Sequence, residues 1–185
     1  GEVYQVQSAL IRNSSVGPKK ATMTATQSLK LEAQKLEQKG DLSAPTLDLS
    51  AVAEIEDSAD STIKTTHLKT ALKRSWTPQG TLEVNDWQDT SDEHVFIQNK
   101  GTILSHQKTS IQARFRTLAG GKSDLAGVNF KNSHDRYQTL VNEGETLLRK
   151  VEELGYHKDI DNRAGGSLVF LDCGYSWHYQ RDENG

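Results

Sequence analysis

The sequence predicts an all-β fold: a parallel β-helix, or β-solenoid, of about twenty residues per turn over residues 1–131, followed by a helix and a short strand within residues 132–185. Three observations predict this fold. A polar turn followed by an aliphatic residue recurs at nearly constant spacing, apolar and polar residues alternate between these turns, and hydrophobic residues make up only 34% of the chain.

The recurring motif is clearest in Lys39-Gly40-Asp41-Leu42 and in Lys100-Gly101-Thr102-Ile103. Each copy is expected to place its last residue, the anchor, in the interior of the coil. The anchors of five copies are Met23, Leu42, Ile63, Leu82 and Ile103, spaced by 19, 21, 19 and 21 residues, and a sixth copy ends 22 residues later at Leu125.

The segment from Leu42 to Ile55 alternates apolar and polar residues over most of its length, as a half-buried strand does. Each turn of a solenoid directs only a few aliphatic side chains inward, where they stack on those of the next turn. Such a thin core is consistent with an aromatic content of 6% and a mean hydropathy of −0.68.

Two other structures remain open for parts of this region. Residues 26–39 are strong helix formers, and Leu29, Ala33 and Leu36 also fit one helical face. A strand is preferred there, because the equivalent segment of the next turn follows Pro45, which excludes a helix interior. The other alternative is a Thr- and Ser-rich sandwich with an accidental repeat.

The last third of the chain changes from the repeat to a helical period, which predicts a helix beginning at Ser133 as N-cap and ending at Gly155. This helix would cap the open end of the solenoid or interrupt it between two solenoid segments. A strand is predicted at Ser167–Leu171, before an aromatic-rich tail. The apolar stripe of the helix comprises Tyr137, Leu140, Val141, Leu147, Leu148, Val151 and Leu154.

The composition excludes several classes of protein. Lys and Arg number 22 against 25 Asp and Glu, a net charge of −3, and neither sign forms the long block that a nucleic-acid partner requires. No stretch has the 18 or more apolar residues of a membrane span. The single cysteine, Cys173, excludes an internal disulfide and every multi-cysteine metal site. We expect a fragment of a larger protein, with any export signal outside it.

The segments Gly40–Ala51 and Gly101–Ala113 resemble filamentous-haemagglutinin repeats, and the resemblance covers about residues 8–130. It implies a right-handed parallel β-helix from a large Gram-negative exoprotein, which two-partner secretion exports through an outer-membrane transporter and holds at the cell surface. Adhesins and the stalks of contact-dependent inhibition toxins belong to this family. Trp76, Trp87 and the acidic loop Asp86–Glu93 depart from the pattern, as does the last third of the chain.

Five aromatic residues are the candidates for binding a partner. Trp76 and Trp87 flank a Pro-Gln-Gly turn and could form a platform for a glycan or receptor, or each could cover an irregular turn of the coil. Tyr175, Trp177 and Tyr179 could bind a partner or dock on the predicted helix.

No catalytic, cofactor or metal site is predicted. Cys173 and His178 could form a thiolate–imidazole pair, but a third member is missing, so an unreactive cysteine beside a surface histidine is favoured. His157, Asp159 and Asp161 lack the five or six oxygen ligands of a cation loop, and a solvated turn is favoured. Surface positions are expected for the scattered histidines, which are His67, His94, His106 and His134.

The expected function is therefore that of a structural or binding segment without catalysis, a monomer with a receptor on a host or neighbouring cell. Specificity would come from residues 85–94 and 131–185, which break the repeat. One alternative is a trimeric phage-tail or type VI secretion spike. The other is the start of a toxin or carbohydrate-active enzyme, although Asp41, Asp48 and Asp86 do not occupy equivalent positions in the repeat.

Overall fold

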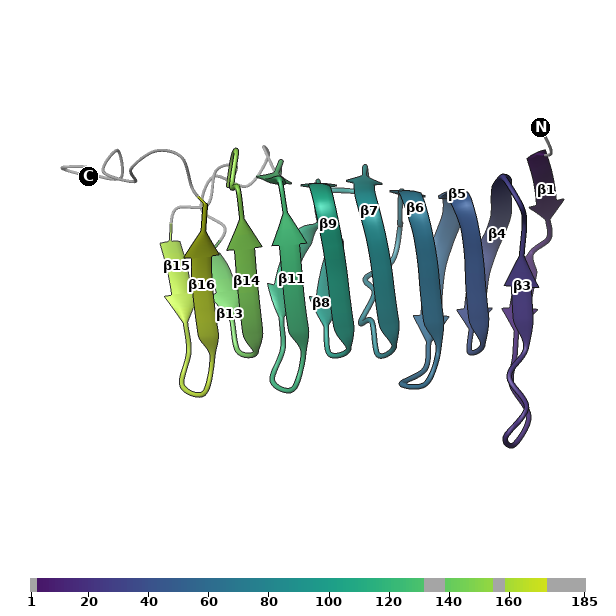
Figure 1. Ribbon diagram of the computed structural model, residues 1–185, viewed down its shortest axis with the longest axis horizontal. Helices are drawn as coiled ribbons and strands as arrows, with labels where there is room; N and C mark the ends of the chain where they lie inside the picture. The colour runs from purple at the N-terminus through teal and green to yellow at the C-terminus, as the bar shows by residue number, and fades with distance from the viewer. Residues whose placement is uncertain (1–2, 132–138, 155–158, 173–185) are drawn as a thin grey trace.

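The computed structural model describes residues 3–131, 139–154 and 159–172, and these form a parallel β-solenoid. It has about 8 turns of roughly 21 residues each. Figure 1 shows the turns stacked side by side, with β1 and β3 at one end and β15 and β16 at the other. The predicted all-β solenoid is confirmed.

Two sheets run along the stack, and every strand pairs in parallel with a strand of a neighbouring turn. One has the order β1-β4-β5-β6-β7-β9-β11-β14-β16, with β2, β3 and β12 attached, and the other has the order β15-β13-β10-β8. The strands are β1 Val3–Gln7, β2 Leu10–Asn13, β3 Thr22–Thr24, β4 Ser28–Gln38, β5 Asp41–Asp57, β6 Thr62–Thr70, β7 Thr81–Asp89, β8 Phe96–Asn99, β9 Thr102–Ile111, β10 Arg114–Thr117, β11 Lys122–Ala126, β12 Val128–Phe130, β13 Thr139–Asn142, β14 Glu145–Arg149, β15 Asp159–Asn162 and β16 Ser167–Leu171.

The five predicted anchors lie in one column of directly paired residues. Met23 pairs with Leu42, and the pairing continues in order through Ile63, Leu82 and Ile103. Each of the last four is at most 3% exposed. The motif therefore marks successive turns of one coil.

The sixth anchor is wrong by two residues. Ile103 pairs with Ser123, whereas Leu125 pairs with Ser105. Both residues face inward because a shift of two keeps a side chain on the same face of a strand. Ser123 is accommodated in the core because its hydroxyl lies within hydrogen-bonding distance of Asn99 and Thr117.

Residues 28–38 form strand β4 with alternating burial, so the helical alternative for this segment is wrong. Leu29, Leu31 and Leu36 point into the core, and Leu29 and Leu36 stack on Leu47 and Ile55 of the next turn. Tertiary stacking here overrides the local helix propensity.

The predicted C-terminal helix is also wrong where the structure describes it. Residues 139–142 and 145–149 are strands β13 and β14, and the coil continues past residue 131 because β14 pairs with β11 and β16 with β14. Leu140 and Leu148 are buried as strand residues. The apparent helical stripe arises because the turn at Gly144 separates two short alternating strands. Strand β16 confirms the predicted strand, while Ser133, Tyr137 and Gly155 lie outside the described residues.

A column of small residues lines one corner of the coil. A Cβ atom added to Gly101 would lie 2.1 Å from the carbonyl oxygen of Gly80, and one added to Gly40 would lie 2.3 Å from that of Ala21. The same carbonyls accept the ladder hydrogen bonds of the next turn, as Gly80 does from the Thr102 amide at 3.0 Å. At Gly40 and Gly101 the close approach of two backbones thus favours glycine, whereas Ala21 and Ser61 occupy the same corner in two other turns.

The same corner is cross-linked by buried amide side chains, which lie two residues before glycines of this column. The Nδ2 group of Asn142 donates to the carbonyls of Gly144 and Ser167, both at 3.0 Å, and to Asn162 Oδ1 at 2.8 Å. Its Oδ1 accepts from the Thr146 hydroxyl at 2.7 Å. Gln38 and Asn99 bond to turn carbonyls in the same way, so one side chain ties together consecutive turns.

We expect Asn142→Ala to lower the free energy of unfolding by about 2 kcal/mol, because it leaves buried groups of the corner without partners. Urea unfolding followed by circular dichroism measures this change. Asn85→Ala is the matched control, since the Asn85 side chain makes no hydrogen bond within the described residues, and it should cost under about 0.5 kcal/mol. Equal losses for the two variants would contradict the proposed role of the corner amides.

Candidate binding groove

An open groove of about 970 Å³ runs across the first turns of the solenoid. It is lined by β4 and β5, by the end of β1 with the residues before β2, and by the residues after β6. Its lining comprises Gln7, Ser8, Ala9, Glu32, Ala33, Gln34, Lys35, Ser50, Ala51, Val52, Ala53, Glu54, Ala71, Lys73 and Arg74.

The groove exists because the long strands β4 and β5 run through a bend without a break. Their ladder shifts register between Lys30 and Glu32, as expected of a β-bulge that bends a strand. At the bend the carbonyl oxygen of Ala53 accepts from the amides of Lys73 and Arg74, at 2.9 and 3.1 Å. Small outward side chains at the bend leave the space open.

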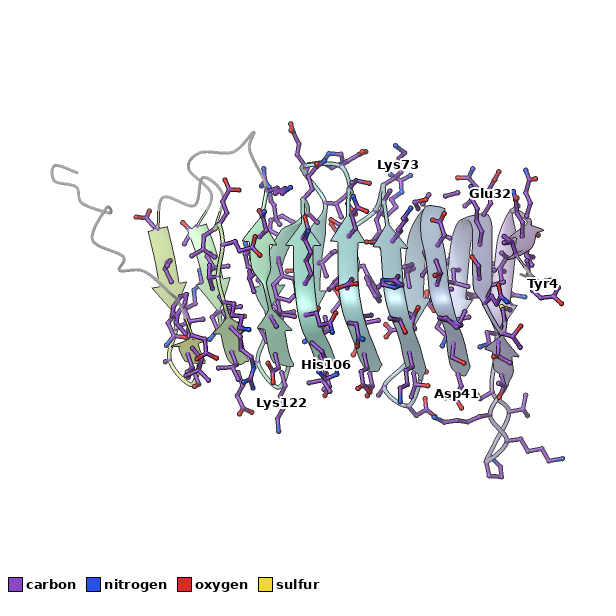
Figure 2. The ribbon with its side chains drawn as sticks, turned by 45° about the horizontal axis from the view of Figure 1, so that its top comes forward. Tyr4, Glu32, Asp41, Lys73, His106 and Lys122 are labelled. Carbon is purple, nitrogen blue, oxygen red and sulfur yellow. The ribbon has the colours of Figure 1, made fainter. Side chains whose placement is uncertain are left out.

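The rim of the groove carries charges of both signs. Glu32 and Glu54 contribute carboxylates, and Lys35, Lys73 and Arg74 contribute cations. Figure 2 shows Glu32 and Lys73 on one side of the coil, with Asp41, His106 and Lys122 on the opposite side. A long ligand lying along the axis would contact small side chains at the floor and hydrogen-bonding charged groups at both rims.

The structure contradicts the prediction that Trp76 and Trp87 form an exposed platform. They are 2% and 1% exposed, respectively, and belong to the core. Trp87 pairs with Leu68 and Thr109 of the neighbouring turns, and its Nε1 donates to the Thr70 hydroxyl at 3.0 Å. The Nε1 of Trp76 donates to Asp57 Oδ1 at 3.4 Å, so the single polar group of each buried indole has a partner. The alternative, that each tryptophan fills an irregular turn, agrees with this burial.

Residues 86–89 are not a loop, because strand β7 continues to Asp89. The three histidines that the structure describes, His67, His94 and His106, are exposed as predicted. The ring of His67 lies 2.9 Å from the Asp86 carboxylate and that of His106 lies 2.9 Å from Glu83.

The remaining predicted residues divide into two groups. Asp41, Asp48 and Asp86 lie in three different columns of the sheet, so they form no row of acids. Asp159 and Asp161 lie on β15, and no group of three His, Cys, Asp or Glu residues that could hold a metal ion occurs in the described ranges. The others lie outside the described residues: His134, His157, Cys173, Tyr175, Trp177, His178 and Tyr179.

Burial raises the pKa of the Asp57 carboxyl above its ordinary value, although hydrogen bonds from the amides of Gly80 and Gln79 and from Trp76 oppose the shift. The pKa of Asp57 is thus higher in the folded chain than in the unfolded chain. The group therefore stabilises the fold at pH values below its pKa in the unfolded chain, and this contribution is lost as the pH rises through its pKa in the folded chain.

We therefore expect the pKa of the Asp57 carboxyl group to lie above about 3.9, the value of a free aspartate. Carbon-detected NMR titration of the folded chain measures this pKa. The pKa of Asp41, which a hydrogen bond from the Thr62 hydroxyl lowers, serves as the internal comparison. An Asp57 pKa at or below that of Asp41 would contradict the buried environment.

The groove was not predicted from the sequence. Its only signal is the run of small residues at 50–53 with Ala9 and Ala71 in neighbouring turns, and this signal has meaning only once the strand register is known. No helix in the described part of the chain is long and apolar enough to cross a membrane. No protein-family model, curated protein or solved structure matches the sequence or the fold of this chain.

Proposed function

We propose that this chain is a rod segment of a large secreted exoprotein of the filamentous-haemagglutinin type, displayed on a Gram-negative cell surface, which holds a binding function away from the cell without catalysis. The observation that carries the proposal is the in-register stacking of similar turns, from Met23 through Ile103, in one continuous column. A rod of this kind lengthens by about 4.8 Å with every added turn.

Pairing of opposite charges on neighbouring turns supports a stiff rod with a fixed register. Lys30, Asp48 and Lys69 follow one another in a single column along the axis. Arg149 makes two contacts with the carboxylate of Asp124, at 3.0 and 3.2 Å. In the first of these columns a slip of one turn would place Lys30 against Lys69, so its alternation favours the observed register.

The groove supports a ligand that is itself extended, and we propose a surface glycan or peptide chain of the receptor as its ligand. An open floor of alanine and serine admits a polymer of variable length, and the mixed rim charges provide hydrogen bonds to hydroxyl or amide groups. The trimeric spike is less well supported, because a single chain supplies one continuous hydrophobic cluster from Ile11 to Val151.

Two experiments test this function. An antibody raised against the folded chain should label intact, unpermeabilised source cells, and labelling only after permeabilisation would contradict surface display. Beads coated with the chain should also adhere to host or neighbouring cells.

Filling the groove with Ala53→Leu should reduce bead adhesion at least about fivefold, since the leucine occupies the space of the ligand. Ser43→Leu on another column of β5 should leave adhesion unchanged. Equal adhesion by both variants would show that the groove is not the binding site.

A further inference from the structure

Two arginines and a phenylalanine form a cationic patch on the outer face of the smaller sheet. Arg114 and Arg116 alternate with buried residues on β10, so both side chains point out of the coil. Phe96 on β8 is the direct partner of Arg114 and also lies on the outer face. None of these residues lines the groove, so the patch is a separate surface in the middle of the solenoid.

The phenyl ring of Phe96 holds both guanidinium groups. The Cζ atom of Arg116 lies 4.5 Å from the ring centroid, and that of Arg114 lies 5.4 Å from it. Both distances are within the range of a cation–π interaction. Arg114 is also fixed by its Nε, which donates to the carbonyl oxygen of Glu93 at 3.1 Å. Two cations are therefore brought together and oriented before any ligand binds.

Arg116 lacks the carboxylate partner that other arginines of the chain have. It makes no hydrogen bond or ion pair in the part of the chain that the structure describes. Its neighbours in the column, Gln98 and Val141, carry no charge. An external carboxylate would complete at Arg116 the pairing that three other arginines make with an adjacent turn: Arg12 with Glu37, Arg149 with Asp124 and Arg163 with Glu143, at 2.7, 3.0 and 3.0 Å.

The surroundings of Arg116 favour an anion. Partial burial lowers the pKa of Arg116 below its ordinary value, and the nearby guanidinium groups of Arg163 and Arg114 add to this effect, whereas Glu143 opposes it. Glu143 is itself engaged by Arg163. An incoming carboxylate would therefore relieve repulsion among the cations and meet a guanidinium that is partly removed from water.

We propose that this patch binds an acidic segment of a partner protein, with one carboxylate on the guanidinium of Arg116 and a second beside Arg114. A guanidinium presents parallel N–H donors that fit a carboxylate with two hydrogen bonds. Because Phe96 already restricts both arginines, little side-chain entropy is lost when the segment binds. The proposal rests neither on the proposed surface display nor on the groove.

The patch fits an acidic protein segment better than a nucleic acid. Proteins that bind single-stranded nucleic acid combine a long basic groove with aromatic rings on which the bases stack. Here two guanidinium groups already pack on the ring of Phe96, and the chain has a net charge of −3. Arginine and aromatic residues are also enriched where proteins contact one another.

Fluorescence anisotropy of the 185-residue chain with a dye-labelled oligoglutamate peptide tests the proposal, and the matching oligoglutamine peptide is its reference. We expect saturable binding of the glutamate peptide alone, and weaker binding as the salt concentration rises. Arg116→Gln should reduce the affinity at least about tenfold, because it removes the donors that receive the carboxylate. Arg116→Lys keeps the charge without the forked geometry and should recover only part of this loss.

Arg74→Gln is the matched control. It removes the same charge from another exposed arginine that has no ion pair in the described part of the chain. Because Arg74 lies at the rim of the groove, the comparison also separates the patch from the groove. The control should leave the affinity unchanged within about twofold, since charges far from the ligand are screened. Circular dichroism checks that every variant folds.

Any of three results would overturn the proposal. The first is a glutamate peptide that does not bind even at low salt. The second is a loss of affinity in Arg74→Gln as large as that in Arg116→Gln, which would place the peptide in the groove or on no defined site. The third is a thymidine oligonucleotide of the same charge that binds as tightly as the peptide, which would indicate a general surface for polyanions.

Discussion

Replacing Gly101 by alanine is expected to destabilise the solenoid by about 3 kcal/mol or more. The new Cβ would lie 2.1 Å from the Gly80 carbonyl oxygen and 2.6 Å from the backbone of Gln79. Because these neighbours are backbone atoms of the preceding turn, neither can rotate away, and the ladder between the two turns must separate. Chemical unfolding monitored by circular dichroism measures the loss.

Gly17→Ala is the matched control for this substitution. Gly17 has a φ of +59° and no heavy atom within 4 Å of an added Cβ, so alanine introduces only local backbone strain there. That strain costs about 1 kcal/mol. If Gly101→Ala cost no more than Gly17→Ala, the close approach of turns at the corner would be refuted.

Asp89→Ala is expected to lower the free energy of unfolding by about 3 to 4 kcal/mol. The Asp89 carboxylate is 2% exposed and accepts hydrogen bonds from the hydroxyls of Thr70 and Ser91, at 2.7 and 2.5 Å. It also accepts from the amides of Ala113 and Gln112, at 2.9 and 3.2 Å. Its removal leaves donors from three consecutive turns without an acceptor.

A second pair of variants separates lost hydrogen bonds from lost volume. Thr70 and Asp89 lie in one column between Leu49 and Ile111, so the column is aliphatic on either side of them. Asp89→Leu alone should be strongly destabilising, and adding Thr70→Val should recover less than about 1 kcal/mol, because it removes the orphaned Thr70 donor but leaves the buried Trp87 Nε1 without its acceptor. A larger recovery in the double variant would show that the hydrogen bond from Trp87 to Thr70 is unimportant.

The turns from Met23 to Ile103 could be predicted because the local sequence and the stacked structure require the same residues there. The corner demands glycine in Lys-Gly-Thr-Ile, and the interior demands an aliphatic anchor two positions later. The turn at residues 118–121 is different, since its core position is Ser123, whose partners are the side chains of Thr117, just before this turn, and of Asn99 in the preceding turn of the coil. Sequence spacing alone therefore placed that anchor at Leu125.

The sequence could not predict the C-terminal strands or the burial of the tryptophans, and the reasons are related. Leu140, Leu147 and Leu148 have spacings that fit both a helix and two short strands, and the backbone approach that makes Gly144 a turn comes from Leu118, far away in the chain. The burial of Trp87 depends on its stacking with Leu68 and the small Thr109. The groove likewise depends on the bend in β4 and β5.

Spin-label distances along one outward column test the parallel stack most directly. In a Cys173→Ser background, a label at Ser43 is paired in turn with one at Leu104, Leu147 or Val169, which lie three, five and six turns away in the observed register. Labelled chain diluted into unlabelled chain should give distances of about 14, 24 and 29 Å, which is about 4.8 Å for each turn. Distances that do not increase in proportion to the number of turns would contradict the solenoid.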